Sequence, residues 1–273
     1  MAKLTEDERL FRKIEDKIKR AIFDYGLIND GDRILVGLSG GKDSLALVDL
    51  LGRRSKIYCP RFEVVVAHIV MTNIPYCSDR EYLRSCAEEH DLPFIVHETS
   101  FDPSTDTRKS PCFLCSWTRR KALFEIAKAH KCNKIALGHH YDDVIETILM
   151  GMLYGAQVQT MMPKLHSTNF ESMELIRPLY LVREDDIKAW RDYNHLHFIQ
   201  CACKFTDTCT TCNNEENRSK RVEIKELIRE MKKKNPFVEG NIFKSVENVN
   251  LDTVVCYKKD GERHWFLDDY DEK

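Results

Sequence analysis

The first candidate for chemistry in this chain is a short glycine-rich turn, Ser39-Gly40-Gly41-Lys42-Asp43-Ser44. It follows the apolar run 35–38 and opens a segment with apolar residues at helical spacing. Glycines let the backbone approach a ligand closely, and the first N–H groups of a helix favour an anion. A Walker A loop differs, because here Val36 occupies its first glycine position and Asp43 follows the lysine. The turn therefore predicts a phosphate-binding loop of another type.

A second polar cluster follows the short apolar strand 134–138 and consists of His139, His140, Asp142 and Asp143. Histidine can transfer a proton near neutral pH, and carboxylates can bind a divalent cation. In an open parallel sheet, ligand-binding groups gather at the carboxyl ends of the strands. Because the glycine turn and this cluster both follow strands directly, we expect them to face one cleft.

The cysteines form a third group, with eleven in the chain and two pairs at C-x-x-C spacing, Cys112-x-x-Cys115 and Cys209-x-x-Cys212. Two thiolates at this spacing can bind one metal centre, although a stable site needs further ligands. The two pairs together predict, as one alternative, a structural zinc site, and reduced thiols without metal are another. The sequence has no signal-peptide core and no membrane-length apolar stretch, so we expect a cytoplasmic protein without membrane contact, in which disulfides are disfavoured.

Strands that alternate with helices must position these groups. We expect strands at 35–38, 62–70, 94–97 and 134–138, with helices between them. This alternation indicates parallel pairing and right-handed crossovers. The predicted fold is α/β with a doubly wound parallel sheet. We expect an N-terminal amphipathic helix in residues 1–30, the nucleotide-binding domain in 31–200, and a cysteine-containing segment, basic helix and tail in 201–273. The residues after 234 show little periodicity.

Taken together, these features resemble the tRNA 2-thiocytidine synthetases of the PP-loop ATP pyrophosphatase superfamily. The resemblance rests on the glycine loop, the first cysteine pair, and the motifs at 137–143, 162–165, 176–179 and 183–187. It extends roughly from Asp32 to Glu230. It implies the PP-loop ATPase fold, with similarity to adenine nucleotide α-hydrolases, ATP as a substrate and tRNA as a partner.

The resemblance also implies roles for the candidate residues. The Gly40 and Gly41 amides and the Ser39 and Ser44 hydroxyls fit the pyrophosphate of ATP, and Lys42 offsets its charge. Asp43, with Asp142 or Asp143, can hold Mg²⁺. We expect Asp43, His139 and Asp143 to be catalytic, and Gly138 and His140 to contact the nucleotide. A buried structural role for one of the two histidines remains an alternative.

The same family holds a [4Fe-4S] cluster with three cysteines, which leaves one iron open to bind sulfur. By this resemblance the ligands are Cys112, Cys115 and one later cysteine. Our prediction for the third ligand is Cys212, and the alternatives are Cys203 and Cys209.

The function implied is ATP-dependent tRNA thiolation. ATP adenylates O2 of an anticodon-loop cytidine, and sulfur from the cluster replaces that oxygen to give 2-thiocytidine. A sulfur donor such as a cysteine desulfurase and pairing of two copies into a homodimer are also implied. The alternatives are a 2-thiouridine synthetase with the same mechanism and a non-catalytic metal-binding or redox-sensing module, which would leave Asp43, His139 and Asp143 unexplained.

A lysine- and arginine-rich segment at 218–234 adds a second indication of an RNA partner. The formal net charge of the whole chain is -2, so only the local distribution is informative. Basic side chains in this segment can contact RNA phosphates. They alternate with Glu223, Glu226 and Glu230, so a solvated helix face with lysine–glutamate pairs explains the pattern equally well.

Overall fold

The computed structural model describes residues 5–57, 59–73, 78–102, 104, 111–167, 170, 173–196, 220–268 and 270. The chain forms two compact units. Unit 1 contains Met1–Val144 and Met161–Ser219, and unit 2 contains Ile145–Thr160 and Lys220–Lys273. The domain boundaries expected near residues 30 and 200 stay a prediction.

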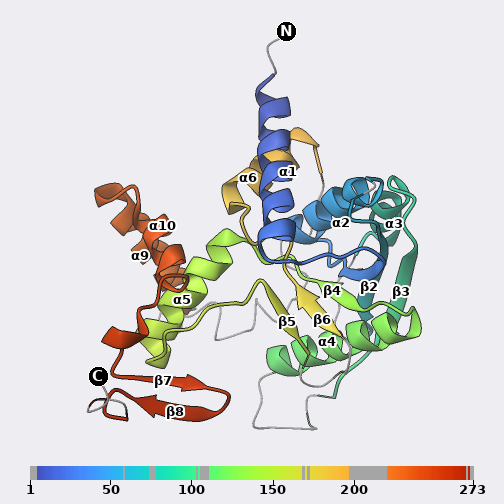
Figure 1. Cartoon of the computed structure of the whole chain (residues 1–273). Helices are drawn as coiled ribbons and strands as arrows, with labels where there is room; N and C mark the ends of the chain where they lie inside the picture. The colour runs from blue at the N-terminus through green and yellow to red at the C-terminus, as the bar shows by residue number, and fades with distance from the viewer. Residues whose placement is uncertain are drawn as a thin grey trace. The chain divides into compact units, whose positions relative to one another are not determined.

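Unit 1 is built on a six-stranded sheet with the strand order β3-β2-β1-β4-β6-β5 (Figure 1). The strands are β1 (Asp32–Gly37), β2 (Phe62–Met71), β3 (Phe94–Thr99), β4 (Lys134–Ala136), β5 (Lys164–His166) and β6 (Glu174–Ile176). All neighbouring pairs are parallel except β5 and β6. The predicted doubly wound sheet is confirmed, with one antiparallel edge strand. The strand order reverses between β1 and β4, where such sheets bind ligands.

Successive strand residues point into two separate apolar cores, because strand side chains alternate between the faces of a sheet. Ile34 and Val36 pack in one core with the helices α1 (Glu6–Asp24), α2 (Lys42–Ser55), α3 (Arg80–Glu88) and α6 (Glu184–Tyr193). Leu35 packs in the other core with α4 (Pro111–Ala129). The helices on the two faces leave the carboxyl ends of β1, β4 and β6 side by side at one edge.

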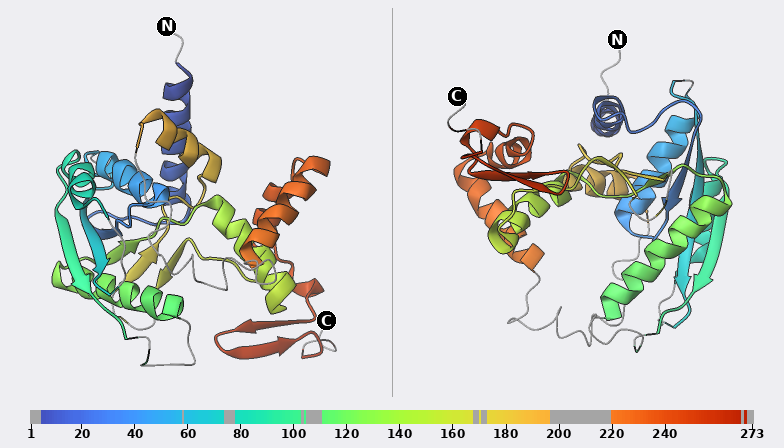
Figure 2. Two further views of the ribbon diagram at one scale, coloured as in Figure 1. Left: turned by 180° about the vertical axis from the view of Figure 1, so that it is seen from behind. Right: turned by 60° about the horizontal axis from the view of Figure 1, so that its bottom comes forward.

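The N-terminal helix α1 packs on unit 1 and lies beside α6 in the views of Figures 1 and 2. It begins with a capping box between Thr5 and Glu8 and buries its apolar stripe. Lys13 and Lys17 pair with Asp186 of α6 at 2.6 and 2.9 Å. Burial alone would raise the pKa of Asp186, but the two lysines outweigh it and hold that pKa below its usual value. The predicted amphipathic helix and its packing on the main domain are confirmed.

Unit 2 contains most of α5 (Tyr141–Gly155), together with α9 (Lys220–Lys234), α10 (Val238–Ser245), the short 3-10 helix η2 (Leu251–Thr253) and the hairpin β7 (Cys256–Lys259) and β8 (Glu262–Trp265). Buried Glu146 on α5 pairs with Arg221 at 3.3 Å and Lys225 at 3.6 Å. Lys232 and Lys233 on α9 are also paired with glutamates. Several basic side chains of α9 therefore pair with carboxylates within unit 2. This is the pattern expected for a solvated helix face with lysine–glutamate pairs. No helix in the described ranges is both long and apolar enough to span a membrane.

Candidate active site

The glycine loop connects β1 to α2 and is shaped by its two serines. The Ser39 N–H donates to Ser44 Oγ at 3.2 Å, and the Ser44 hydroxyl donates to the Gly41 carbonyl at 2.9 Å. Gly40 has φ +84°, a left-handed conformation that favours glycine. Gly41 is the N-cap of α2 and provides no side-chain cap. The first N–H groups of α2 are thus available to an anion, as the sequence predicts.

Buried His68 on β2 fixes the start of this loop. Its Nδ1 lies 2.7 Å from the Leu38 carbonyl oxygen, and its Nε2 lies 3.0 Å from Ser78 Oγ. Burial lowers the pKa of His68, and the nearby cations Arg119 and Arg80 lower it further, so the ring is neutral. Because a carbonyl oxygen only accepts, Nδ1 carries the proton and Nε2 accepts from the serine hydroxyl.

Lys42 lies between two carboxylates at the start of α2. Its Nζ is 3.0 Å from Asp43 and 3.2 Å from Glu184, at the start of α6. Burial would lower the pKa of Lys42, but these two carboxylates outweigh burial and raise it. Lys42 is therefore a protonated cation held at the mouth of the anion-binding loop.

The cluster after β4 meets the loop, as expected from the strand order. A Cβ added at Gly138 would lie 3.4 Å from three atoms of Asp43, so the two segments are in contact there. His140 is buried, and its Nε2 lies 3.8 Å from Asp43 Oδ1. On the other side of the ring, Nδ1 lies 3.5 Å from Asp143 Oδ2 and forms no hydrogen bond with any described residue. His139 is half-buried, so His140 is the buried member of the pair.

The two aspartates of the cluster have different surroundings. Asp142 Oδ1 pairs with Arg183 at 3.0 Å, and its Oδ2 accepts from the Glu184 N–H at 2.7 Å. Asp142 therefore caps the start of α6 and joins it to α5. Asp143 Oδ2 accepts from the His140 N–H at 3.0 Å. Of the two candidates for a cation ligand, Asp142 contacts the start of α6, whereas Asp143 contacts the backbone N–H and the ring of His140.

The carboxylates near His140 can hold a magnesium ion only together with further ligands from a bound molecule. The described residues contain no group of three or more histidines, cysteines or carboxylates that could hold a metal by themselves. Asp43 and Asp143 flank the same His140 ring. Because Mg²⁺ usually takes one or two carboxylates and completes its shell with phosphate oxygens and water, this pair fits a nucleotide-bound ion.

The first cysteine pair lies at the start of α4, which begins at Pro111, one residue before Cys112. Residues three apart on a helix lie on the same face, so Cys112 and Cys115 are suitably placed to share a metal centre. Cys115 is half-buried against the α4 core. Further along α4, a Cβ added at Gly37, at the end of β1, would lie 3.2 Å from the Leu123 side chain, so α4 packs against the strand that leads into the glycine loop. The Cys112 side chain and Cys203, Cys209 and Cys212 lie outside the described residues.

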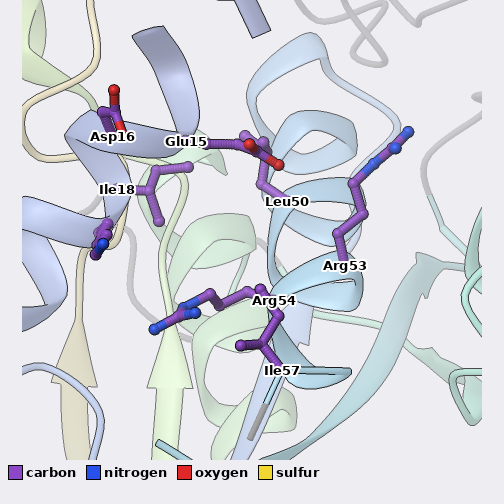
Figure 3. A pocket seen from close by; sticks show the side chains of 8 residues that line it. Glu15, Asp16, Ile18, Leu50, Arg53, Arg54 and Ile57 are labelled. Carbon is purple, nitrogen blue, oxygen red and sulfur yellow. The ribbon is translucent and has the colours of Figure 1, made fainter. Parts of the chain in front are cut away.

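A separate pocket of about 260 Å³ lies between α1 and α2, away from the candidate site (Figure 3). Its walls carry both acidic and basic side chains, among them Glu15, Arg53 and Arg54. Burial is the largest influence on Glu15 and raises its pKa. The mixed charge favours no single class of ligand.

Three residues at or near the site were not assigned roles from the sequence: His68, Glu184 and Arg177. Glu184 and Arg177 lie in motifs that supported the family resemblance, which was the signal that could have found them. His68 lies in a long apolar strand, and only its burial with two hydrogen bonds shows its role.

Comparisons with known proteins show which family this chain belongs to. A model of the PP-loop domain family matches residues 10–208. The chain is 35% identical over 254 residues to the tRNA-cytidine(32) 2-sulfurtransferase of Geotalea daltonii, covering 89% of this chain and 94% of that protein. It is 34% identical over 249 residues to the protein of the same name from Hahella chejuensis, covering 89% of this chain and 83% of that one.

Among solved structures, the U34-tRNA thiolase NcsA from Methanococcus maripaludis with its [4Fe-4S] cluster matches with a TM-score of 0.70 at 20% identity. The match covers 92% of this chain and 83% of that chain, and it shows a shared fold. The chain belongs to the PP-loop domain family and, within it, to the tRNA-cytidine(32) 2-sulfurtransferase family.

Proposed function

We propose that this protein is an ATP-dependent tRNA sulfurtransferase that converts an anticodon-loop cytidine to 2-thiocytidine. The observation that carries the proposal is the contact between the loop after β1 and the cluster after β4, where Gly138 lies against Asp43. This contact puts an anion-binding helix terminus beside carboxylates that can hold a divalent ion. The names of the relatives support cytidine over uridine as the target.

ATP first turns the cytidine oxygen into a leaving group. The O2 atom forms a bond to the α-phosphorus, the bond from that phosphorus to the bridging oxygen breaks, and pyrophosphate leaves. The free N–H groups of α2, with Ser39 and Ser44, hold the pyrophosphate. Protonated Lys42 moves partly away from its two carboxylate partners, Asp43 and Glu184, and neutralises phosphate charge. Asp43 and Asp143 would hold Mg²⁺, which when bound would offset the charge of the phosphates.

Sulfur then replaces the activated oxygen. A hydrosulfide forms a bond to C2, the C2–O bond breaks, and AMP leaves with the original oxygen. The hydrosulfide proton needs an acceptor, and His139 or His140 provides one. His140 suits this role because its Nδ1 has no hydrogen-bond partner among the described residues.

Cys112 and Cys115 would hold an iron–sulfur cluster with a third cysteine, which we propose is Cys212, with Cys203 and Cys209 as alternatives. The residues fit such a group, because thiolates are its usual ligands and a helix N-terminus favours the thiolate form. When bound, a cluster with three protein ligands supplies an iron position that can hold sulfide.

Sulfur must reach the protein from a donor, and we propose a cysteine desulfurase in this role. The reducing conditions that free thiols require and the tRNA substrate fit a cytoplasmic location. We also propose that two copies pair as a homodimer, which light scattering of the purified protein would test.

The reaction can be tested with purified protein, ATP, Mg²⁺, sulfide and unmodified tRNA without oxygen. We expect AMP and 2-thiocytidine to form in equal amounts. Asp43→Asn should lower both by at least about a hundredfold, because it removes a cation ligand at the reacting phosphate. As a matched control, Glu63→Gln changes an exposed carboxylate paired with Arg33 and should leave the rate unchanged. A redox-sensing module would form no AMP, and a uridine-specific enzyme would form 2-thiouridine.

A further inference from the structure

Arg177 follows β6 directly and carries a buried positive charge. It is 7% exposed, and its side chain donates through Nη1 to the Met162 carbonyl. Its Nε is fully buried and has no hydrogen-bond partner among the residues that the structure describes. Burial lowers the pKa of Arg177, and the described residue Tyr180 opposes this effect. Within the described part of the chain, no carboxylate pairs with this guanidinium.

The buried positive charge of Arg177 would be stabilised by a bound anion. Charged groups that leave water are normally paired or fully hydrogen-bonded, because an uncompensated charge is costly to bury. Met162, whose carbonyl accepts from this guanidinium, is itself 54% exposed. Arginine binds phosphate oxygens well, because its planar group offers several N–H donors in a fixed geometry.

The position of Arg177 argues for a phosphate other than those of ATP. Arg177 lies at the same sheet edge as the glycine loop, but β6 is two strands from β1, which corresponds to roughly 10 Å. Its side chain reaches toward the residue before Pro163, on the side of β5, and therefore away from β1. A triphosphate anchored on the loop lies on the other side of β4.

We propose that Arg177 binds a backbone phosphate of the RNA substrate close to the target nucleotide. This inference rests on the proposed function, which brings a tRNA nucleotide to the edge between the loop and β6. Arg177 acts there as a positioning residue: it holds the RNA backbone so that the base reaches the activated phosphate.

The test compares Arg177→Gln and Arg177→Lys with wild-type protein in binding a tRNA anticodon stem-loop, without ATP, over a range of salt concentrations. Arg177→Gln should bind this RNA about 10- to 100-fold more weakly. The slope of log affinity against log salt should fall by roughly one phosphate contact. Arg177→Lys should keep the slope and recover part of the affinity, whereas ATP affinity should stay unchanged in both variants.

Arg33→Gln is the matched control. Arg33 also has a buried Nε without a hydrogen-bond partner, but it pairs with Glu63 at 2.7 Å and lies near the amino end of β1, at the opposite edge of the sheet. Its replacement should leave RNA affinity and the salt slope unchanged.

Other outcomes overturn the inference. If ATP affinity falls and RNA affinity does not, the anion belongs to ATP. If only the urea midpoint falls, Arg177 merely braces the Met162 segment. If wild-type protein binds no tRNA, the proposed function itself fails.

A second measurement does not depend on folded variants. Single phosphates of the stem-loop are replaced by uncharged methylphosphonates, and each RNA is bound to wild-type protein. We expect one position near the target where the loss of charge weakens binding to the wild-type protein about tenfold. Equal effects at every position would refute the assignment.

Discussion

Replacing Lys134 with methionine should destabilise the protein strongly, because this buried side chain ties together the strands that carry the candidate site. Lys134 is 1% exposed. Its Nζ contacts Asp32 at 2.8 Å, Glu174 at 3.1 Å and the Leu27 carbonyl at 2.8 Å, so all three of its donors are used. Removing it leaves two largely buried carboxylates without their shared cation. We expect a loss of about 3–5 kcal/mol in the free energy of unfolding.

Lys164→Met is the matched control, because Lys164 also contacts Glu174, at 3.3 Å, and a backbone carbonyl, that of Gly26, at 3.0 Å. Its side chain is 28% exposed, so we expect a loss of about 1 kcal/mol or less. Urea denaturation of both variants at neutral pH measures the difference. A loss at Lys134 no larger than that at Lys164 would refute the reasoning.

The contacts of Glu174 with Lys134 and Lys164 lead to a prediction about pH. Burial would raise the pKa of Glu174, but Lys134 and Lys164 outweigh it and hold that pKa below its ordinary value of 4.5. The resulting stability is therefore fully present above pH 4.5 and is lost as pH falls through the lower folded pKa. The cost of Lys134→Met should shrink over this acidic range. A cost that does not change with pH would contradict the assignment.

Two further predictions concern the loop and the N-terminal helix. His68→Leu should weaken ATP binding about tenfold, measured by calorimetry, because the loop carbonyl loses its donor; unchanged affinity would show that the loop keeps its shape without the ring. Asp186→Asn should lower the free energy of unfolding by about 1–3 kcal/mol at pH 7. Since the lysines depress the pKa of Asp186, that loss should fade as pH drops below 3.8, and a loss that grows in acid would argue against the ion pairs.

The sequence predicted the parts of the fold that depend on local patterns. The strand, glycine turn and helix at 35–51 and the apolar stripe of α1 are periodic features that neighbouring residues determine. The hairpin β7–β8 was missed because its strands are short and partly exposed, so they carry little hydrophobic alternation. Sequence periodicity is informative only where one face of an element is buried.

The candidate site could be predicted only in part, for a similar reason. Because β1 and β4 are parallel neighbours that end at Gly37 and Ala136, the loop and the histidine cluster that follow them lie at the same edge of the sheet. The contacts of Lys42 with Glu184 and of His68 with Leu38 join residues far apart in the chain, and no spacing rule predicts them. The different surroundings of Asp142 and Asp143 likewise depend on where α6 begins.

The most direct test of the account is mass spectrometry of tRNA nucleosides from cells with and without the gene. We predict that 2-thiocytidine disappears when the gene is deleted, returns with the wild-type gene, and stays absent with Asp43→Asn. Glu63→Gln should restore it as the wild-type gene does. Unchanged 2-thiocytidine in the deletion strain, with or without loss of 2-thiouridine, would contradict the assignment of this protein as the enzyme that thiolates cytidine.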